Sequence, residues 1–209
     1  MEQLATARWR RRKDERPAEI LEAALAVFAE RGYSATRMDD IARRAGVTKG
    51  TIYLYFESKE AVFQSLVSES IGSTIGVMTV AAESFAGSAA DLLRMVLRGI
   101  GTFIRESDRV VLPKIFIAEA GNFPALAEFY RREVVDRGLA LLTSIIARGI
   151  AQGEFRAVEP EHTARLCIAP LLVAVFWRTT FAKFDAVPYD LHGLIETHID
   201  VLLRGLMKE

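Results

Sequence analysis

The stretch from Thr36 to Lys59, TRMDDIARRAGVTKGTIYLYFESK, decides the fold of the N-terminal part of the chain. Apolar residues recur in it at helical spacing, and hydroxyl side chains stand where helix caps are expected. The pattern predicts two short helices, over 38–45 and 49–56, joined by a tight turn at Gly46. This arrangement is a helix-turn-helix, whose second helix enters the major groove of DNA in proteins that bind it.

The second predicted helix carries side chains suited to a DNA surface. Lys49 and Thr51 can reach base edges or phosphates, and the hydroxyls of Tyr53 and Tyr55 can bond phosphates without adding charge. Gly50 lets the backbone approach a ligand closely. The competing interpretation is a small helical bundle with tyrosines and lysines on its surface, because helix-turn-helix geometry also occurs in proteins that bind no DNA.

Lys59 stands in the first turn of the next predicted helix, which begins after the cap Ser58. A cation there opposes the helix dipole, so it needs another reason to be present. A phosphate that also meets the N–H groups of the helix end supplies one.

The whole string from Gly32 to Glu60, GYSATRMDDIARRAGVTKGTIYLYFESKE, closely resembles the DNA-binding domain of TetR-family transcriptional regulators, with mild departures at Arg37 and Thr48. The resemblance implies a homodimer that binds palindromic double-stranded DNA. The residues that match the family's DNA contacts are Thr36, Arg37, Thr48, Lys49, Gly50, Thr51, Tyr53, Tyr55 and Lys59. Among these, Lys49 and Thr51 are expected to read bases, and Thr36, Tyr53, Tyr55 and Lys59 to hold phosphates.

Charge is unevenly distributed along the 209 residues, although 27 basic and 27 acidic side chains balance overall. Residues 8–16 hold six basic and two acidic side chains, and residues 31–59 hold six and three. An anionic partner is therefore expected at the N-terminal end. The basic arm within residues 1–16, centred on Arg8–Lys13, is either a further DNA contact or a solvated tail.

Helical spacing continues through the rest of the chain, and almost nothing is typical of a strand. The fold class is therefore predicted as all-α, with about nine helices. An N-terminal three-helix helix-turn-helix domain over 1–57 precedes a larger helical domain for ligand binding and dimerisation over 58–209. The expected helices lie at 17–31, 38–45, 49–56, 59–81, 88–106, 108–120, 123–152, 160–183 and 189–207, with kinks or early ends at Pro113 and Pro170.

The resemblance also implies that the C-terminal helices surround an effector pocket. The expected lining residues are apolar or aromatic, with a few polar groups among them: Met78, Leu97, Phe103, Phe116, Glu119, Asn122, Phe123, Leu172, Trp177, Arg178 and Phe181. Such stripes are also typical of plain core. The scarcity of polar groups favours an apolar or amphipathic ligand, and the segment 115–130 loosely resembles that of family members that control multidrug efflux pumps.

Two helices are expected to form a dimer interface. The run from Leu166 to Trp177 is apolar nearly all round, so it must be covered on more than one side. The last helix carries an apolar stripe at steps of three and four. The predicted interface residues are Leu166, Val173, Leu191, Leu194, Ile195, His198, Leu202 and Leu206, arranged as a four-helix bundle across a two-fold axis. The alternative is packing within one chain.

The sequence gives little indication of a disulfide, a metal site, a catalytic site or a membrane span. The single cysteine, Cys167, excludes an intramolecular disulfide, and the three histidines lack metal-ligand spacing. No nucleophile or phosphate-loop motif is present, so no catalytic residue, metal or cofactor is expected. The longest uncharged runs, 13 and 12 residues, are shorter than the roughly 18 that a membrane span needs. Without a signal peptide, a cytoplasmic protein is expected.

We therefore expect a ligand-responsive DNA-binding regulator: a repressor released by a small effector and controlling an efflux or catabolic operon. The first rival is a helix-turn-helix interaction or nucleoid module without an effector, which predicts no well-formed apolar pocket. The second is a helical enzyme with a vestigial N-terminal end, which turnover of a bound ligand would reveal.

Overall fold

The computed structural model describes the backbone of residues 2–208 and the side chains of residues 16–208. The side chains of the basic arm Arg8–Lys13 lie outside this described set. Within the described residues the chain forms helices and no named strand, and two residues, Phe155 and Met207, make an isolated bridge. The all-α prediction is confirmed.

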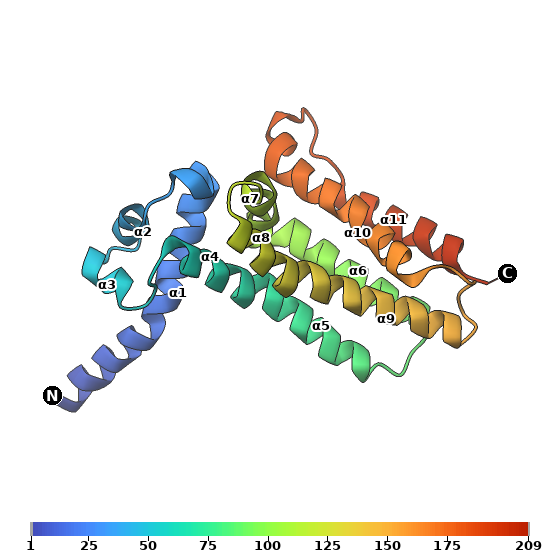
Figure 1. The fold of residues 1–209 in the computed structure, drawn as a ribbon, viewed down its shortest axis with the longest axis horizontal. Helices are drawn as coiled ribbons and strands as arrows, with labels where there is room; N and C mark the ends of the chain where they lie inside the picture. Colours follow the sequence, from blue (N-terminus) through green and yellow to red (C-terminus); the bar gives the residue numbers. More distant parts are fainter. Residues whose placement is uncertain (1, 209) are drawn as a thin grey trace. The chain divides into compact units, whose positions relative to one another are not determined.

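The helices follow the order drawn in Figure 1. The α-helices are α1 (Glu2–Ala35), α2 (Met38–Arg44), α3 (Lys49–Tyr53), α4 (Lys59–Val67), α5 (Ser73–Glu83), α6 (Ala89–Glu106), α7 (Val111–Glu119), α8 (Pro124–Tyr130), α9 (Arg137–Ala151), α10 (Pro160–Phe176) and α11 (Leu191–Leu206). Wider π-helical turns occupy Ser68–Gly72, Arg131–Asp136 and Trp177–Phe181, and 3-10 turns occupy Asp108–Val110 and Ala182–Phe184.

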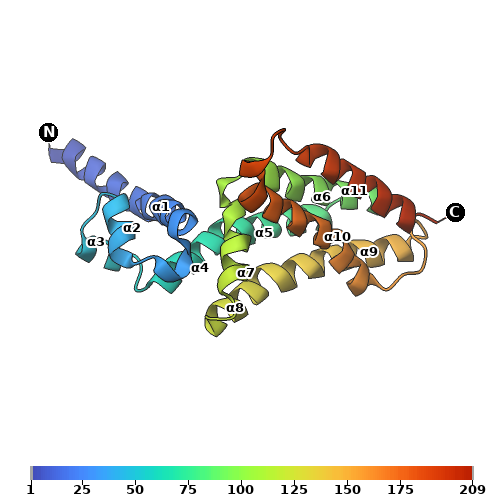
Figure 2. The same ribbon diagram turned by 90° about the horizontal axis from the view of Figure 1, so that it is seen from above.

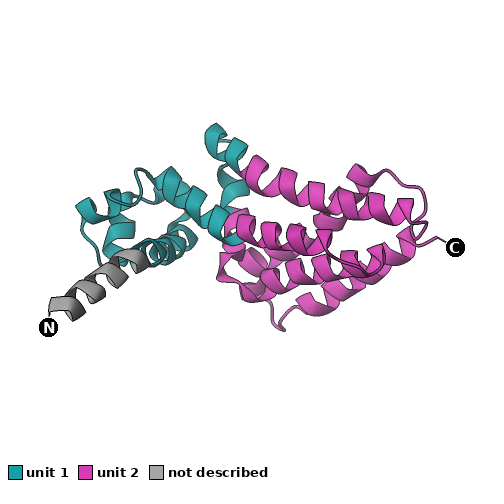
Figure 3. Ribbon diagram, turned by 90° about the horizontal axis from the view of Figure 1, so that it is seen from below, with its two compact units in different colours: residues 1–70, 115–129 teal, residues 71–114, 130–209 magenta. Residues whose placement is uncertain are grey.

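The chain divides into two compact units (Figure 3). The first, which we call the reading unit, comprises residues 1–70 and 115–129, and the second, the cavity unit, comprises residues 71–114 and 130–209. The division falls 13 residues beyond the boundary expected after residue 57, and it adds the segment 115–129 to the reading unit. The sequence gives no local sign of this addition, because it rests on tertiary contacts.

An aromatic cluster forms the centre of the reading unit. The ring of Phe63 from α4 meets those of Phe28 and Tyr33 from α1 edge-on, with centroids 5.5 and 5.4 Å away. Phe123 meets Tyr33 edge-on at 4.9 Å. Edge-to-face rings add to the stabilisation that comes from burying their area. Phe28, Phe63 and Ile41 of α2 have no exposed surface.

Helix α1 changes direction at Gly32, whose φ of 76° lies in the left-handed region that favours glycine. The expected end of the first helix at this glycine agrees with that break. The expected start is wrong, because the helix continues upstream and Pro17 lies inside it.

Four helices of the cavity unit, α6, α9, α10 and α11, lie side by side (Figures 1 and 2). Their facing sides form one apolar core that includes Leu93, Leu97, Ile146 and Cys167. Helix α10 continues through Pro170 to Phe176, so of the two expected alternatives, a kink or an early end, the early end does not occur.

Candidate DNA interface and ligand cavity

The helix-turn-helix is built by a left-handed glycine and a threonine cap. Gly46 has φ 65°, and the N–H of Val47 donates to the carbonyl of Ala42 at 3.0 Å, which closes the turn. The hydroxyl of Thr48 accepts from the N–H of Thr51 at 3.1 Å and begins α3. Ile52 is fully buried, so it anchors one side of α3 and leaves the other side outward.

The outward side of α3 carries most of the residues predicted to contact DNA. Arg37, Thr48, Lys49, Gly50 and Tyr53 are exposed, and Thr51 and Tyr55 are half-buried. Two neighbours were not predicted. Leu54 is 82% exposed beside the tyrosines, and the Asp39 carboxylate lies 3.1 Å from the ammonium of Lys49. Both groups are exposed in that ion pair, so it is weak and can be exchanged for a phosphate or a base.

Thr36 and Lys59 have intramolecular roles. Thr36 is buried, and its hydroxyl donates to the Gly32 carbonyl at 2.7 Å. The Lys59 ammonium donates to the carbonyls of Tyr33 at 2.6 Å and Ser34 at 3.3 Å, and lies 4.3 Å from the centre of the Tyr33 ring. Its burial lowers the pKa of Lys59, and the Glu119 carboxylate opposes that change. These contacts at the end of α1 explain a cation at the start of α4 without a phosphate.

Glu119, at the end of α7, completes this arrangement in the reading unit. Its carboxylate accepts from the Ser34 N–H at 3.1 Å and from the Ser34 hydroxyl at 2.7 Å. The Asn122 amide donates to it at 3.4 Å. The hydrogen bonds from Ser34, chiefly that of its hydroxyl, lower the pKa of Glu119, and the nearby Lys59 ammonium adds to this.

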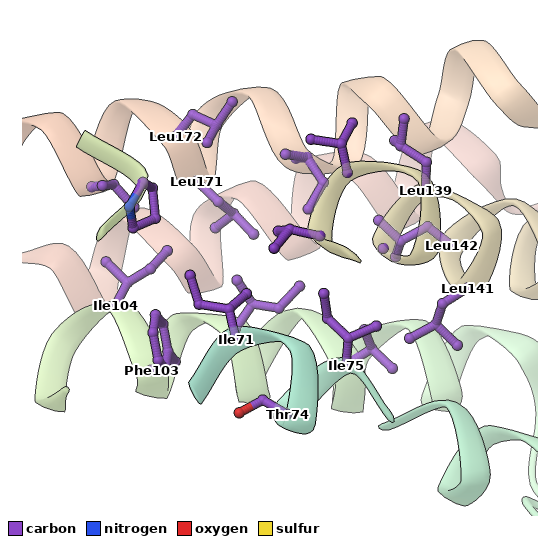
Figure 4. A pocket seen from close by; sticks show the side chains of 18 of the residues that line it. Ile71, Thr74, Ile75, Phe103, Ile104, Leu139, Leu141, Leu142, Leu171 and Leu172 are labelled. Carbon is purple, nitrogen blue, oxygen red and sulfur yellow. The ribbon is translucent and has the colours of Figure 1, made fainter. Parts of the chain in front are cut away.

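The cavity unit contains a hollow of about 440 Å³ with an almost entirely apolar wall (Figure 4). Helices α5, α6, α9 and α10 supply most of the wall. Its residues are Ile71, Thr74, Ile75, Met78, Val96, Ile100, Phe103, Ile104, Pro113, Tyr130, Val134, Val135, Gly138, Leu139, Leu141, Leu142, Arg165, Ile168, Ala169, Leu171, Leu172 and Val175. This volume is in the range of small-molecule sites, roughly 300–1,000 Å³.

Three of the predicted pocket residues, Met78, Phe103 and Leu172, line this cavity. The others lie elsewhere: Leu97 in the core, Phe116, Glu119, Asn122 and Phe123 in the reading unit, and Trp177, Arg178 and Phe181 in the turn after α10. The reason lies in the tertiary packing of the helices. Helical spacing finds apolar faces but does not tell which face closes on a neighbour and which faces a hollow.

The predicted residues after α10 have contacts of their own. Arg178 donates to the carbonyls of Ile104 and Ser107, the latter at 3.0 Å, and so caps the end of α6. The indole N–H of Trp177 donates to Asp185 at 2.8 Å, and its ring packs against Tyr189 with centroids 5.0 Å apart.

Lining residues that were not predicted come mainly from α6, α9 and α10, with others from α5 and the turn before it. The uncharged run at residues 70–82 was the available signal for Ile71 and Ile75, because a helix without charges on any face has more than one apolar neighbour to meet. Leu139 and Leu142 were hidden in an ordinary amphipathic stripe.

The predicted dimer residues fall into three groups. Leu166 and Val173 on α10 are 63% and 59% exposed. Leu191, Leu194, His198 and Leu202 are half-buried, and the His198 ring nitrogen lies 2.9 Å from the Cys167 carbonyl. Ile195 and Leu206 are buried inside the chain and are not available to a partner. The α11 stripe is wide enough to face α6 on one side and outward on the other. Val201, 65% exposed, extends the outward part and was not predicted.

Reactive and metal-binding groups are scarce in the part of the chain that the structure describes. Cys167 is fully buried, and burial raises the pKa of its thiol to about 12, which makes it inert. Among the described residues, no group of three His, Cys, Asp or Glu side chains is placed to hold a metal ion.

By length and composition alone, the helical stretches Lys59–Glu83 and Pro160–Phe184 are apolar enough to cross a membrane. The same test is passed by helices of soluble proteins. The first stretch lines the cavity with Ile71, Ile75 and Met78, and the second carries the exposed face with Leu166 and Val173.

Comparison with known proteins also distinguishes an N-terminal part, which includes the helix-turn-helix, from a C-terminal part. Residues 20–66 match the model of the bacterial regulatory proteins of the tetR family, and residues 86–186 match the tetracyclin repressor-like C-terminal domain. The chain belongs to the TetR family. It is a helix-turn-helix transcriptional regulator, as the N-terminal motif predicted.

TetR-family relatives resemble the chain over nearly its whole length. It is 28% identical over 196 residues to the fatty acid metabolism regulator protein of Bacillus subtilis, covering 93% of this chain and 98% of that protein. It is 28% identical over 196 residues to the HTH-type transcriptional repressor KstR2 of Rhodococcus jostii, covering 93% and 92%. The structure of the regulator FadR from Bacillus subtilis in complex with stearoyl-CoA superposes with TM-score 0.76, at 25% identity, over 90% of this chain and 98% of that one.

Proposed function

We propose that this TetR-family regulator is a repressor that binds a palindromic operator as a homodimer and releases it when a small apolar or amphipathic effector occupies the cavity unit. The observation that carries the proposal is the apolar cavity of about 440 Å³ in a chain that also presents an exposed α3. A helix-turn-helix interaction module without an effector has no need of such a cavity.

The DNA contacts proposed are the exposed groups around α3. Lys49 and Thr51 read bases, and Tyr53 and Tyr55 hold phosphates. Lys59 is assigned to the fold of the reading unit, because its ammonium already bonds two carbonyls there.

The homodimer is proposed to form through the outward faces of α10 and α11. Leu166, Val173 and Val201 are large apolar side chains that are each more than half exposed. Exposed apolar side chains that cluster on one face are typical of protein interfaces. The half-buried Leu194 and Leu202 on α11 are expected at its edge.

A long acyl chain is the effector that the relatives favour. The Bacillus subtilis fatty acid metabolism regulator matches 93% of this chain, and the FadR structure from the same organism is a complex with stearoyl-CoA. A wall of aliphatic side chains suits such a tail. We therefore propose control of an operon for lipid catabolism in the cytoplasm, without catalysis by the regulator itself.

Helix α7 is proposed to couple the two functions. Its first turn carries Pro113, which lines the cavity, and Lys114, whose ammonium donates to the Thr179 carbonyl at 3.0 Å. Its last residue, Glu119, bonds Ser34 at the end of α1. A ligand that shifts Pro113 therefore shifts the first turn of a helix whose last residue belongs to the reading unit and bonds Ser34 there. By linkage, operator DNA must weaken effector binding by the same factor as effector weakens DNA binding.

The two lysines are expected to differ in the salt dependence of DNA binding. Lys49→Ala should reduce the slope of log K against log salt by about one, because its exposed ammonium reaches phosphate or bases. Lys59→Ala should leave that slope unchanged and lower the stability of the reading unit by about 1 kcal/mol, since it loses hydrogen bonds to two carbonyls. Salt titrations of binding and denaturant melts of both variants separate the two roles. A lower slope for Lys59→Ala would return that lysine to the DNA interface.

The test of the function as a whole begins with selection of bound sequences from a random DNA pool. A palindrome is expected. Stearoyl-CoA should then release the selected DNA from the protein. Sequence-independent binding, or binding that no acyl compound changes, would contradict the proposal and favour the interaction module.

A further inference from the structure

The cavity wall contains three polar side chains, Thr74, Tyr130 and Arg165. Thr74 and Tyr130 each have an interaction partner inside the protein. Arg165 is the one charged residue among the described residues that line the cavity. Its side chain is 57% exposed, so the guanidinium belongs to the open, solvated part of the wall.

Arg165 stands at one end of the cavity along α10. The α10 residues in the wall run from Arg165 to Val175, and ten residues of α-helix span roughly 15 Å. The wall between them is apolar and includes Ile168 and Leu172. Figure 4 shows Leu171 and Leu172 toward one end of the hollow and Leu139 and Leu142 toward the other. The cavity is therefore elongated, with a cation at one end and hydrocarbon along its length.

The guanidinium of Arg165 makes few contacts within the protein. It donates to the Glu161 carbonyl of its own helix at 2.9 Å and lies 3.9 Å from the exposed Glu161 carboxylate. Two other arginines of the same unit make more hydrogen bonds than Arg165 does. Arg98 makes two bonds to the Glu196 carboxylate, at 2.8 and 2.6 Å. Arg148 donates to two backbone carbonyls at 3.0 and 2.7 Å. A guanidinium carries five N–H donors, so Arg165 retains the capacity to bind an anion.

We infer that Arg165 binds the anionic head of a single-chain amphiphile whose tail fills the cavity. The inference rests on the proposed function, and it adds the ligand's charge and the residue that selects for it. An aliphatic wall binds the tail of an acid, an alcohol or an alkane equally well. The guanidinium favours an anionic head over a neutral one, because a carboxylate or phosphate accepts two parallel hydrogen bonds from it. Seating the tail also covers part of this end from water, which strengthens the ion pair.

The test compares ligands with one tail and different heads: dodecanoate, dodecanoyl-CoA and 1-dodecanol, each titrated calorimetrically into the full-length protein. The wild-type protein is expected to bind at least one of the two anions about tenfold more tightly than the alcohol. Arg165→Gln should bind that anion and the alcohol equally. Loss of preference for dodecanoate identifies a carboxylate as the head, and loss for dodecanoyl-CoA alone identifies the phosphates of the coenzyme.

Arg204→Gln is the matched control. Arg204 is an exposed arginine paired with Asp200 four residues earlier on α11, and it does not line the cavity. This variant should keep the wild-type preference. Preference retained in Arg165→Gln, or equal wild-type binding of anions and alcohol, overturns the assignment while leaving the proposed function standing. If the wild-type protein binds none of the three compounds, the proposed acyl effector fails and the inference fails with it.

Discussion

Glu119→Ala is expected to bind operator DNA and effector separately with near wild-type affinity, but to lose most of the effect of one on the other. Couplings of this kind are typically about 5- to 150-fold in affinity, and the variant's factor should fall toward one. The reason is that the substitution removes both hydrogen bonds by which the end of α7 holds Ser34. Operator affinities measured with and without stearoyl-CoA give the factor directly.

Two further variants separate coupling from general damage. Ser34→Ala keeps its N–H and loses the hydroxyl that bonds Glu119 at 2.7 Å, so its coupling should be intermediate. Glu128→Ala changes an exposed carboxylate of α8 in the same unit and should couple as the wild type does. A Glu119→Ala protein that releases DNA with the full wild-type factor would exclude α7 as the coupling element.

Lowering the pH should weaken the coupling between effector and DNA binding, as Glu119→Ala does. The pKa of Glu119 is lowered in the folded protein, chiefly by the Ser34 hydroxyl. The ionised carboxylate therefore stabilises this contact at any pH above its pKa in the unfolded chain, and that stabilisation is lost as pH falls through the lowered folded value. Coupling is expected to be constant around neutral pH and to weaken in acid. Glu119→Ala should lack this dependence, and an acid-resistant coupling in the wild type would argue against the carboxylate.

The structural features that depend on local sequence patterns could be predicted. Gly46 needs its left-handed conformation, Thr48 caps α3, and Ile52 recurs at the spacing of a buried face, so the turn and the start of α3 were predicted correctly. The end of α3 was not, because the helix stops at Tyr53 and not at residue 56. Pro17 shows the limit of a local rule. Proline favours a first turn, yet α1 passes through it.

Contacts between distant segments could not be predicted in this way. Lys59 and Glu119 both carry charges that suggest a ligand, and both are used at the end of α1 by Tyr33 and Ser34, far from them in sequence. The same holds for the cavity. Four helices supply most of its wall, and only their packing decides that Ile75 faces a hollow while Leu97 meets a neighbour.

Phe63→Ala is expected to cost the reading unit about 3–5 kcal/mol, because the ring is fully buried and its removal leaves a cavity among rings that cannot close up. Phe28 and Tyr33 lose an edge-on partner at 5.5 and 5.4 Å. A loss of that size is a large part of the stability of a small unit. The reading unit should therefore melt well before the cavity unit in denaturant, and operator binding should be lost with it.

The cavity unit supplies the internal control for this substitution, since Phe63 lies outside it. Dodecanoate or dodecanoyl-CoA should bind Phe63→Ala as they bind the wild type, because the cavity wall is drawn entirely from the other unit. Phe184→Ala removes an aromatic ring that is 75% exposed, and it should change stability by less than about 0.5 kcal/mol. If Phe63→Ala unfolds both units in one transition and abolishes ligand binding together with DNA binding, the two units are one cooperative body. Coupling would then run through the whole fold, and not through a single helix such as α7.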